Sequence, residues 1–348
     1  MSLISYNADS CIRNAYYHNS CSNCVDSCPE NLFSLFQNRI KFDSSLCTYC
    51  SACLGSCPTE AIKIDLFDPN RFTLEFQFSK SDKLTCKNRT QCLSGFDSHH
   101  FTTMILNIDS LECDLSLCSE CDIGEQKASI KTKISDANRV LKSLSSSKKI
   151  DILEEKVEEK ISKREFFNKF VGKVNDVVVI PDIEKYKIDQ LLSKDINVKR
   201  MLPTKQRILI EAIKNSKDFE NVETVDLTDS FLHSKYFEEK CTNCGDCIQF
   251  CPTEALFHSS DKLSIYISAN KCIGCNICHD ICKIDAVQKG KSLEAIDLLR
   301  PKQLISFTMD SCTECKTPFI KRGDEVICER CIDFTTNFSS IFTLARDM

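Results

Sequence analysis

The spacing of the cysteines constrains this chain more than any other feature of its sequence. Its 348 residues include 25 cysteines and only 8 glycines. Many cysteines stand in runs with two residues between neighbours, such as Cys47, Cys50 and Cys53. Such a run cannot pair entirely within itself in disulfides, but its thiols can all reach one polynuclear metal centre. The odd cysteine count and the absence of an apolar leader segment also disfavour a secreted, disulfide-rich protein. We therefore expect metal centres and a reducing cytoplasm.

One cysteine unit, C-x2-C-x2-C-x3-C followed by a short apolar phrase, occurs four times. Three copies are complete, whereas the first copy has His18 where its first cysteine belongs. The units form two pairs, because 18 residues separate Cys28 from Cys47 and 20 separate Cys251 from Cys272. The sequence thus contains two copies of a double unit.

Each pair resembles the bacterial two-cluster [4Fe-4S] ferredoxin, over about residues 11–65 and 238–290. In that family three closely spaced cysteines hold one cubane cluster, and the fourth cysteine ligates the neighbouring cluster. A proline after the fourth cysteine turns the chain away, and Lys283 departs from this pattern after Cys282. The resemblance implies four [4Fe-4S] clusters. Their expected ligands are Cys47, Cys50, Cys53 and Cys28; Cys21, Cys24 and Cys57 with a fourth ligand; Cys241, Cys244, Cys247 and Cys282; and Cys272, Cys275, Cys278 and Cys251.

The fourth ligand of the Cys21 cluster has three candidates. Cys11 offers a thiolate, the better ligand for iron, and the segment after Arg13 is long enough to loop back. His18 stands in register with the missing cysteine, and its neutral imidazole would raise the reduction potential. An open or three-iron site is the third candidate. We expect Cys11.

A separate motif near the end of the sequence contains Cys312, Cys315, Cys328 and Cys331. Two C-x2-C pairs with 12 residues between them are typical of a tetrahedral zinc site, and the motif resembles a zinc ribbon. A rubredoxin-type iron site is the alternative, but rubredoxins carry glycine where this protein has Lys316. We expect one zinc ion.

Five cysteines lie between these motifs, in a stretch that we expect to form a small α/β element. Its expected features are a strand through Phe72, Leu74, Phe76 and Phe78, a helix over 97–106, a strand over 111–115, and His99 and His100 in a solvated loop. Cys113 falls on the second strand and is expected to be a small buried apolar residue. Cys86, Cys92, Cys118 and Cys121 form a candidate fifth metal site, with zinc, a small iron–sulfur centre or plain thiols as the alternatives.

The stretch from Ile123 to Lys240 has no cysteine and is expected to be mainly helical. The pattern predicts an amphipathic helix over 150–161 with an apolar stripe continuing to Val174, a short strand over 177–180, and a helix after Pro203. The helix after Pro203 is expected to bury Ile208, Leu209, Ala212 and Ile213. This region is interpreted as a spacer that packs the two modules together, with a docking surface as the alternative.

The expected fold class is therefore α+β. Two ferredoxin-like two-cluster modules are joined by the small α/β element and the mainly helical region, and a zinc-ribbon-like hairpin follows. The expected boundaries are 1–68, 69–125, 126–235, 236–295 and 303–340.

The composition excludes several classes of function. A net charge of −5 and a pI near 5.8 disfavour nucleic-acid binding, and no apolar stretch is long enough to span a membrane. The few glycines form no nucleotide-binding motif, so no catalytic residues are expected. Saturated clusters without a substrate site indicate a polyferredoxin that relays single electrons between a donor and an acceptor protein, in a formate dehydrogenase or hydrogenase system. The alternatives are an accessory protein for metalloenzyme maturation and a redox-sensing regulator.

Overall fold

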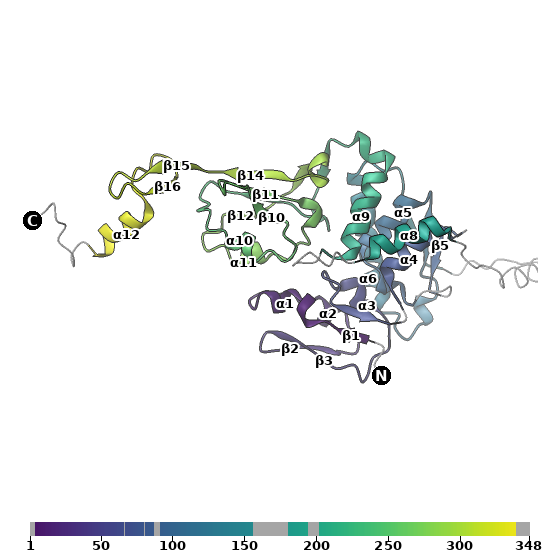
Figure 1. The fold of residues 1–348 in the computed structure, drawn as a ribbon. Coiled ribbons are helices and arrows are strands. Elements are labelled where there is room, and N and C mark those ends of the chain that lie inside the picture. Colours follow the sequence, from purple (N-terminus) through teal and green to yellow (C-terminus); the bar gives the residue numbers. More distant parts are fainter. Residues whose placement is uncertain are drawn as a thin grey trace, which may run out of the picture.

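Figure 1 shows the fold in a computed structural model, which describes residues 4–65, 67–79, 81–86, 91–155, 180–193 and 202–338. The structure is a mixture of helices and short strands. Most of the helix expected over 150–161, its stripe to Val174 and nearly all of the strand expected over 177–180 lie outside the described residues. Within the part that is described, Ile150–Leu153 form strand β7, so the start of the expected helix was wrong.

The two ferredoxin-like modules repeat one order of elements: strand, helix, two strands, helix, strand. In each module the first strand pairs antiparallel with the last, and the two middle strands pair with each other. The N-terminal module also contains the short helix α1 (Ile12–Ala15) before its first repeated helix. The elements are β1 (Ile4–Tyr6), α2 (Asn23–Ser27), β2 (Phe33–Phe36), β3 (Arg39–Phe42), α3 (Ala52–Ser56) and β4 (Ile62–Ile64), followed in the second module by β9 (Lys235–Phe237), α10 (Asp246–Gln249), β10 (Leu256–His258), β11 (Ser264–Ile267), α11 (Ile277–Asp280) and β12 (Val287–Lys289).

A three-stranded parallel sheet lies after the N-terminal module. Its strands β5 (Lys83–Thr85), β6 (Leu111–Asp114) and β7 follow one another in the sheet. Helix α5 (Ser98–Asn107) connects the first two strands, and helix α6 (Gln126–Ser143) connects the last two. Because parallel neighbours need such crossover helices, this is one α/β unit. The unit spans both sides of the boundary that the sequence suggested between 125 and 126.

Two expectations for this unit were wrong. The segment expected as a strand through Phe72 is instead helix α4 (Pro69–Phe76), because Asp68 caps its N-terminus and Pro69 suits the first helical turn. The rings of Phe72 and Phe76 lie one turn apart and stack at 5.8 Å, so the same apolar residues also fit a helix. His99 and His100 lie in α5 rather than in a solvated loop. His100 is only 1% exposed, and its Nδ1 accepts a hydrogen bond from the backbone N–H of Asp97.

Two helices and α4 form a layer beside α5. They are α8 (Asp182–Leu192) and α9 (Thr204–Asn215), and α9 packs against α4, α5 and α8. Helix α9 begins after Pro203 and buries Ile208, Leu209, Ala212 and Ile213, as the sequence predicts. Its first backbone N–H groups, at Thr204 and Lys205, donate to the carboxylate of Glu60 at 2.7 and 2.9 Å. Glu60 follows Cys57 closely, so this contact fastens the helical layer to the N-terminal module.

The C-terminal module is inserted into the body of the protein by a strand pair at its base. Strand β8 (Thr224–Asp226) precedes the module, strand β13 (Ser292–Glu294) follows it, and the two pair antiparallel. Val225 and Leu293 of this pair are buried in the same apolar core as the N-terminal module and the parallel sheet. The inserted module is therefore held at both of its ends.

The C-terminal module continues into an extension. Strand β14 (Lys302–Ser306) pairs with β11, and the hairpin of β15 (Thr308–Ser311) and β16 (Pro318–Lys321) follows with helix α12 (Glu329–Phe338). Figure 1 shows this segment in yellow, beyond the green module and away from the helical layer.

Lys205 makes a buried connection between three elements. Its ammonium group donates to the carbonyl oxygen of Cys57 at 2.7 Å and forms an ion pair with Asp97, which caps α5. Its side chain is 3% exposed. Burial alone would raise the pKa of Asp97, but Lys205 and His99 outweigh burial and hold that pKa well below its usual range.

We predict that Lys205→Met destabilises the protein by about 3–5 kcal/mol, because it leaves the carboxylate of Asp97 buried without its cation. The measurement is the midpoint of thermal unfolding under anaerobic conditions. Lys214→Met is the matched control, since Lys214 is an exposed lysine of the same helix. Equal midpoints for the two variants would show that the buried pair contributes nothing specific.

Candidate metal centres

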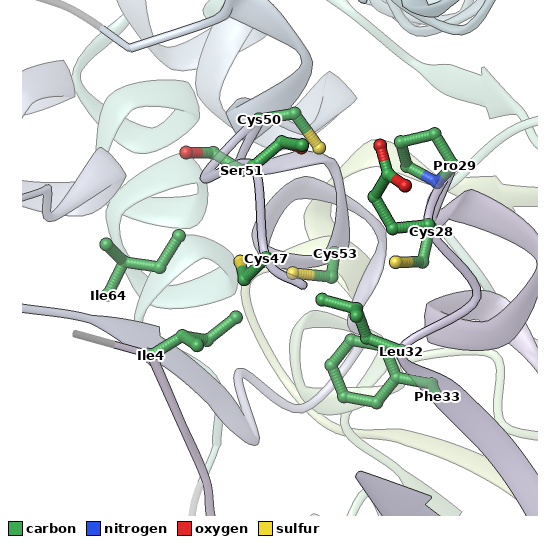
Figure 2. A pocket seen from close by; sticks show the side chains of 12 residues that line it. Ile4, Cys28, Pro29, Leu32, Phe33, Cys47, Cys50, Ser51, Cys53 and Ile64 are labelled. Atoms are coloured by element: carbon green, nitrogen blue, oxygen red, sulfur yellow. The ribbon is translucent and has the colours of Figure 1, made fainter. Parts of the chain in front are cut away.

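A cavity in the N-terminal module is lined by cysteines from both of its units. Cys28 comes from the first unit, whereas Cys47, Cys50 and Cys53 come from the second. Figure 2 shows their sulfurs around this cavity, with the apolar side chains of strands β1, β2 and β4 beside them. Four thiols around an apolar hollow are the donors that an iron–sulfur cluster requires. This is the set of four that the sequence predicts.

The C-terminal module contains a cavity of the same construction. It is lined by Cys251 from the third unit and by Cys272, Cys275 and Cys278 from the fourth. Lys235 of β9 also lines this cavity, a contribution that the cysteine motifs gave no reason to expect. The last cysteine of one unit thus lies with the first three of its partner unit in both modules.

The two remaining sets of four are also brought together. Burial raises the pKa of the Cys24 thiol to about 12, and the nearby thiolates of Cys57, Cys21 and Cys11 contribute to the rise. Burial likewise raises the pKa of Cys247, with contributions from nearby cysteines. These neighbours are Cys278 of the adjacent set and Cys241, Cys244 and Cys282 of its own set. Thiolates that are buried side by side repel one another unless a cation binds them, so both sets suit iron.

The backbone of the complete units adopts one repeated loop. The residue before the second cysteine and the residue after it both have positive φ in each complete unit: Tyr49 and Ser51, Asn243 and Gly245, and Gly274 and Asn276. Left-handed residues are uncommon outside glycine, so their recurrence at matching positions marks one turn geometry that the complete units share. The corresponding residues of the first unit are Ser20 and Ser22, which flank Cys21, and neither has a positive φ. The first unit therefore does not form the same loop.

Cys11 rather than His18 lies with the other thiols of the first set. Cys11 is buried beside Cys21 and Cys24, and its thiolate raises the pKa of both, after the larger effect of burial. His18 is exposed, and its ring packs edge-on against the rings of Tyr16 and Tyr17. The first unit also lacks the left-handed loop residues that follow the corresponding first cysteine in the complete units.

Tyr6 supplies a polar group to the same site. Burial and the thiolates of Cys11, Cys24 and Cys57 raise its pKa, so the hydroxyl keeps its proton. The hydroxyl oxygen is buried, and no described residue forms a hydrogen bond of good geometry with it. The thiol of Cys11 lies close enough to contribute to the raised pKa. A buried O–H donor without an acceptor fits a site whose sulfur atoms accept hydrogen bonds.

The C-terminal motif is a compact group of four cysteines. The sulfurs of Cys312, Cys315, Cys328 and Cys331 lie within 4.8 Å of one another. Among the described residues, no other group of three or more cysteine, histidine or acidic side chains is as compact. The sulfurs of Cys315 and Cys328 are 3.7 Å apart. Four thiolates at 2.3 Å from a tetrahedral zinc would be separated by about 3.8 Å. The group therefore has the dimensions of a mononuclear site.

The five middle cysteines fall into one buried residue and a group of four. Cys113 is completely buried in strand β6. The other four approach one another: after burial, Cys92 and Cys121 raise the pKa of the Cys86 thiol, and Cys92 and Cys86 raise that of Cys118. None of the 25 cysteines forms a disulfide.

Comparison with known proteins agrees with these sites. The 4Fe-4S dicluster domain matches residues 19–61, and the 4Fe-4S binding domain matches residues 235–257. The protein carries two 4Fe-4S ferredoxin-type domains. These domains are iron–sulfur, metal-binding modules of the electron-transfer type.

Relatives match over short segments only. The B subunit of anaerobic dimethyl sulfoxide reductase from Haemophilus influenzae is 38% identical over 59 residues, which are 16% of this protein and 28% of the relative. The archaeal-type glutamate synthase [NADPH] of Thermotoga maritima is 32% identical over 53 residues, 15% of this protein and 10% of the relative. No solved structure matches the sequence significantly. Over the part that the structure describes, no helix has the length and apolar character needed to cross a bilayer.

We predict that Cys11→Ser lowers the iron content by up to one cluster, about four irons per chain, whereas His18→Ala leaves it unchanged. The reason is that Cys11 is buried among the thiols of the set and His18 is exposed. Anaerobic iron and sulfide analysis with electron paramagnetic resonance (EPR) of the reduced protein measures this. Iron loss in the His18 variant alone would reverse the assignment.

Proposed function

We propose that the protein is a polyferredoxin that relays single electrons along four [4Fe-4S] clusters between protein partners. The proposed ligands are Cys28, Cys47, Cys50 and Cys53; Cys11, Cys21, Cys24 and Cys57; Cys251, Cys272, Cys275 and Cys278; and Cys241, Cys244, Cys247 and Cys282. The two cysteine-lined cavities, the grouping of the other thiols and the two ferredoxin-type domains support this proposal.

The observation that carries the relay is the position of Asn19 between the two modules. Its side-chain oxygen accepts a hydrogen bond from the N–H of Cys21 at 3.0 Å. Its side-chain nitrogen donates to the carbonyl oxygen of Cys275 at 2.9 Å. Asn19 is 2% exposed, so one buried amide joins cysteine loops of different modules. The Cys21 and Cys275 clusters are therefore proposed as the neighbours across which an electron passes from one module to the other.

Further contacts keep this junction in place. Gln206 of α9 donates to the carbonyl oxygen of Asn270, next to the fourth unit, at 3.1 Å. The rings of Tyr16 and Phe250 meet edge-on at 5.8 Å. Together with the β8–β13 pair, these contacts hold the C-terminal module, which has an apolar core of its own, against the core that the N-terminal module shares with the parallel sheet. Figure 1 shows the green module beside the purple one.

The proposed chemistry is one-electron transfer without bond making. The clusters held by these cysteines would supply reversible one-electron carriers, so that a donor protein would be oxidised by one electron as an acceptor protein is reduced by one. The sequence alone suggests a formate dehydrogenase or hydrogenase system, whereas the relatives are named as a dimethyl sulfoxide reductase subunit and a glutamate synthase. We therefore propose a larger redox enzyme as the partner, by class only.

The compact C-terminal group is proposed to hold zinc. The 3.7 Å between the sulfurs of Cys315 and Cys328 supports a mononuclear tetrahedral ion. Zinc does not change its oxidation state in proteins, so the group would stiffen the hairpin rather than carry electrons.

The relay predicts rapid electron exchange between the two modules. After a flash delivers less than one electron per protein molecule, freeze-quench EPR should find the clusters of both modules at a common equilibrium. Asn19→Ala should slow this exchange several-fold at unchanged iron content, because it removes both hydrogen bonds of the junction.

Gln288→Ala is the matched control for that experiment. Gln288 lies in β12, outside the cysteine loops, and its side-chain nitrogen donates to the carbonyl oxygen of Asp285 at 3.0 Å, within one module. This variant should exchange electrons at the wild-type rate. Two modules that never equilibrate in the wild-type protein would refute the relay, while their iron–sulfur sites would still stand.

A second prediction concerns Lys235, a buried cation beside the Cys275 cluster. Its ammonium group lies 2.8 Å from Nε2 of His279, and burial together with Lys235 lowers the pKa of His279 to about 4, so the imidazole is a neutral acceptor. A cation stabilises the reduced cluster, which is the more negative state. Lys235→Met should therefore lower that cluster's reduction potential, by about 50–100 mV for a charge roughly 6–8 Å away in a partly screened site.

Potentiometric titration followed by EPR measures this shift. Lys289→Met is the control, because Lys289 pairs with Lys235 across the strands but is exposed. A potential that is the same in both variants would show that the buried charge does not act on the cluster.

A further inference from the structure

We propose that Cys86, Cys92, Cys118 and Cys121 hold a fifth [4Fe-4S] cluster, built on the parallel sheet rather than on a ferredoxin unit. Neither ferredoxin-type domain reaches these residues. The site adds to the proposed relay. The total iron count that tests it rests on the four clusters of the proposed function, whereas variants of its own cysteines test this site alone.

The topology of the sheet brings two parts of the site together. Cys86 directly follows strand β5, and Cys118 follows strand β6 after a short turn. These strands are parallel neighbours, with Thr85 opposite Asp114 in the register. Their carboxyl ends therefore meet at one edge of the sheet, where binding sites of parallel sheets are found.

The segment after β6 folds into consecutive tight turns. The N–H of Cys118 donates to the carbonyl oxygen of Leu115 at 3.1 Å, that of Cys121 to Cys118 at 3.4 Å, and that of Gly124 to Cys121 at 2.8 Å. A Cβ atom at Gly124 would lie 2.1 Å from the carbonyl oxygen of Cys118. Only glycine fits there, so the loop that carries Cys118 and Cys121 is closely wound.

Cys92 brings the site to the N-terminal module. It precedes the short 3-10 helix at Leu93–Gly95, where the hydroxyl of Ser94 donates to the carbonyl oxygen of Cys50 at 2.9 Å. The hydroxyl of Ser51 donates to the side chain of Gln91 at 2.6 Å. The Cys92 thiolate is also among the groups that raise the pKa of Cys50, after burial and Cys28. The fifth site thus adjoins the Cys50 cluster.

The spacing of the thiols favours a cluster over zinc. The zinc-type group at the C-terminus has all four sulfurs within 4.8 Å of one another. In the described part of the protein, Cys86, Cys92, Cys118 and Cys121 form no group that compact, and neither do the four proposed cubane sets. A cubane holds its four thiolates on four separate irons, so they are spread more widely than around one ion. The middle set resembles the cubane sets in this respect.

The site would form an exposed end of the relay. Cys86 and Cys121 are exposed, whereas all four thiols in the neighbouring Cys50 set are partly or fully buried. A reduced one-electron donor protein that docks at this edge would transfer its electron to the fifth cluster and be oxidised by one electron. The electron would then pass to the Cys50 cluster.

The test is metal analysis of the full-length protein, purified without oxygen. The proposal expects about twenty irons and twenty sulfides per molecule with one zinc, because five cubanes contain four irons each. Three results would overturn it. Sixteen irons with two zincs would indicate zinc at this site, and sixteen irons with one zinc would indicate no metal there. Eighteen irons would indicate a two-iron cluster.

Variants locate the additional iron. Cys92→Ser and the exposed Cys121→Ser should each lose about four irons and four sulfides, keep the zinc, and lose one component of the EPR spectrum of the reduced protein. Cys113→Ala is the matched control, because Cys113 is a buried cysteine of strand β6 outside the set. Twenty irons retained by both serine variants would overturn the proposal. The wild-type count decides independently if a variant fails to fold.

Discussion

The exchange of cysteines between neighbouring units is the constraint on which the rest of this structure depends. In the N-terminal module, Cys28 of the first unit lies with the thiols of the second unit, and Cys57 of the second unit lies with those of the first. Cys251 and Cys282 are exchanged in the same way in the C-terminal module. In the proposed ligation, neither unit can complete its cluster without the other. The strand pairs β1–β4 and β9–β12 close each module around this exchange. Since burial raises the pKa of thiols such as Cys24 and Cys278, each to about 12, binding of iron is coupled to the folding of the module.

The same short segment, Pro-Thr-Glu, follows Cys57 and Cys251, but it makes different contacts in the two modules. Glu60 and Glu254 occupy equivalent positions and share a positive φ, at 53° and 54°. Glu60 caps helix α9 with its carboxylate, whereas Glu254 is exposed. The two glutamates share one backbone conformation, but only Glu60 forms a tertiary contact, because the N-terminus of α9 lies within its reach. This contact and the ion pair of Lys205 place the helical layer against the N-terminal module.

Local spacing could be predicted from the sequence, and contacts between distant segments could not. The four expected sets of ferredoxin cysteines rest on the resemblance of short cysteine intervals to one family. The closeness of Cys86 to Cys118 depends on strand β5, which the sequence did not predict, because it placed the first strand of this unit at Phe72 to Phe78. Asn19 and Lys235 carry no motif, because each acts through residues far away in the sequence. The apolar residues near Phe72 fit both a strand and a helix, and the capping by Asp68 decided between them. His100 is buried by packing that periodicity does not report.

The order of the sites in space differs from their order in the sequence. The Cys86 set adjoins the Cys50 set, and Asn19 joins the Cys21 loop to the Cys275 loop. Arg322 of the C-terminal extension lies near enough to Cys241 to oppose the rise in its pKa that burial causes. In the proposed series of clusters, the N-terminal module therefore occupies the middle rather than one end. An electron that enters at the parallel sheet would cross the N-terminal module before it reaches the inserted C-terminal module. The two ends of the proposed series would therefore lie on the parallel sheet and in the C-terminal module.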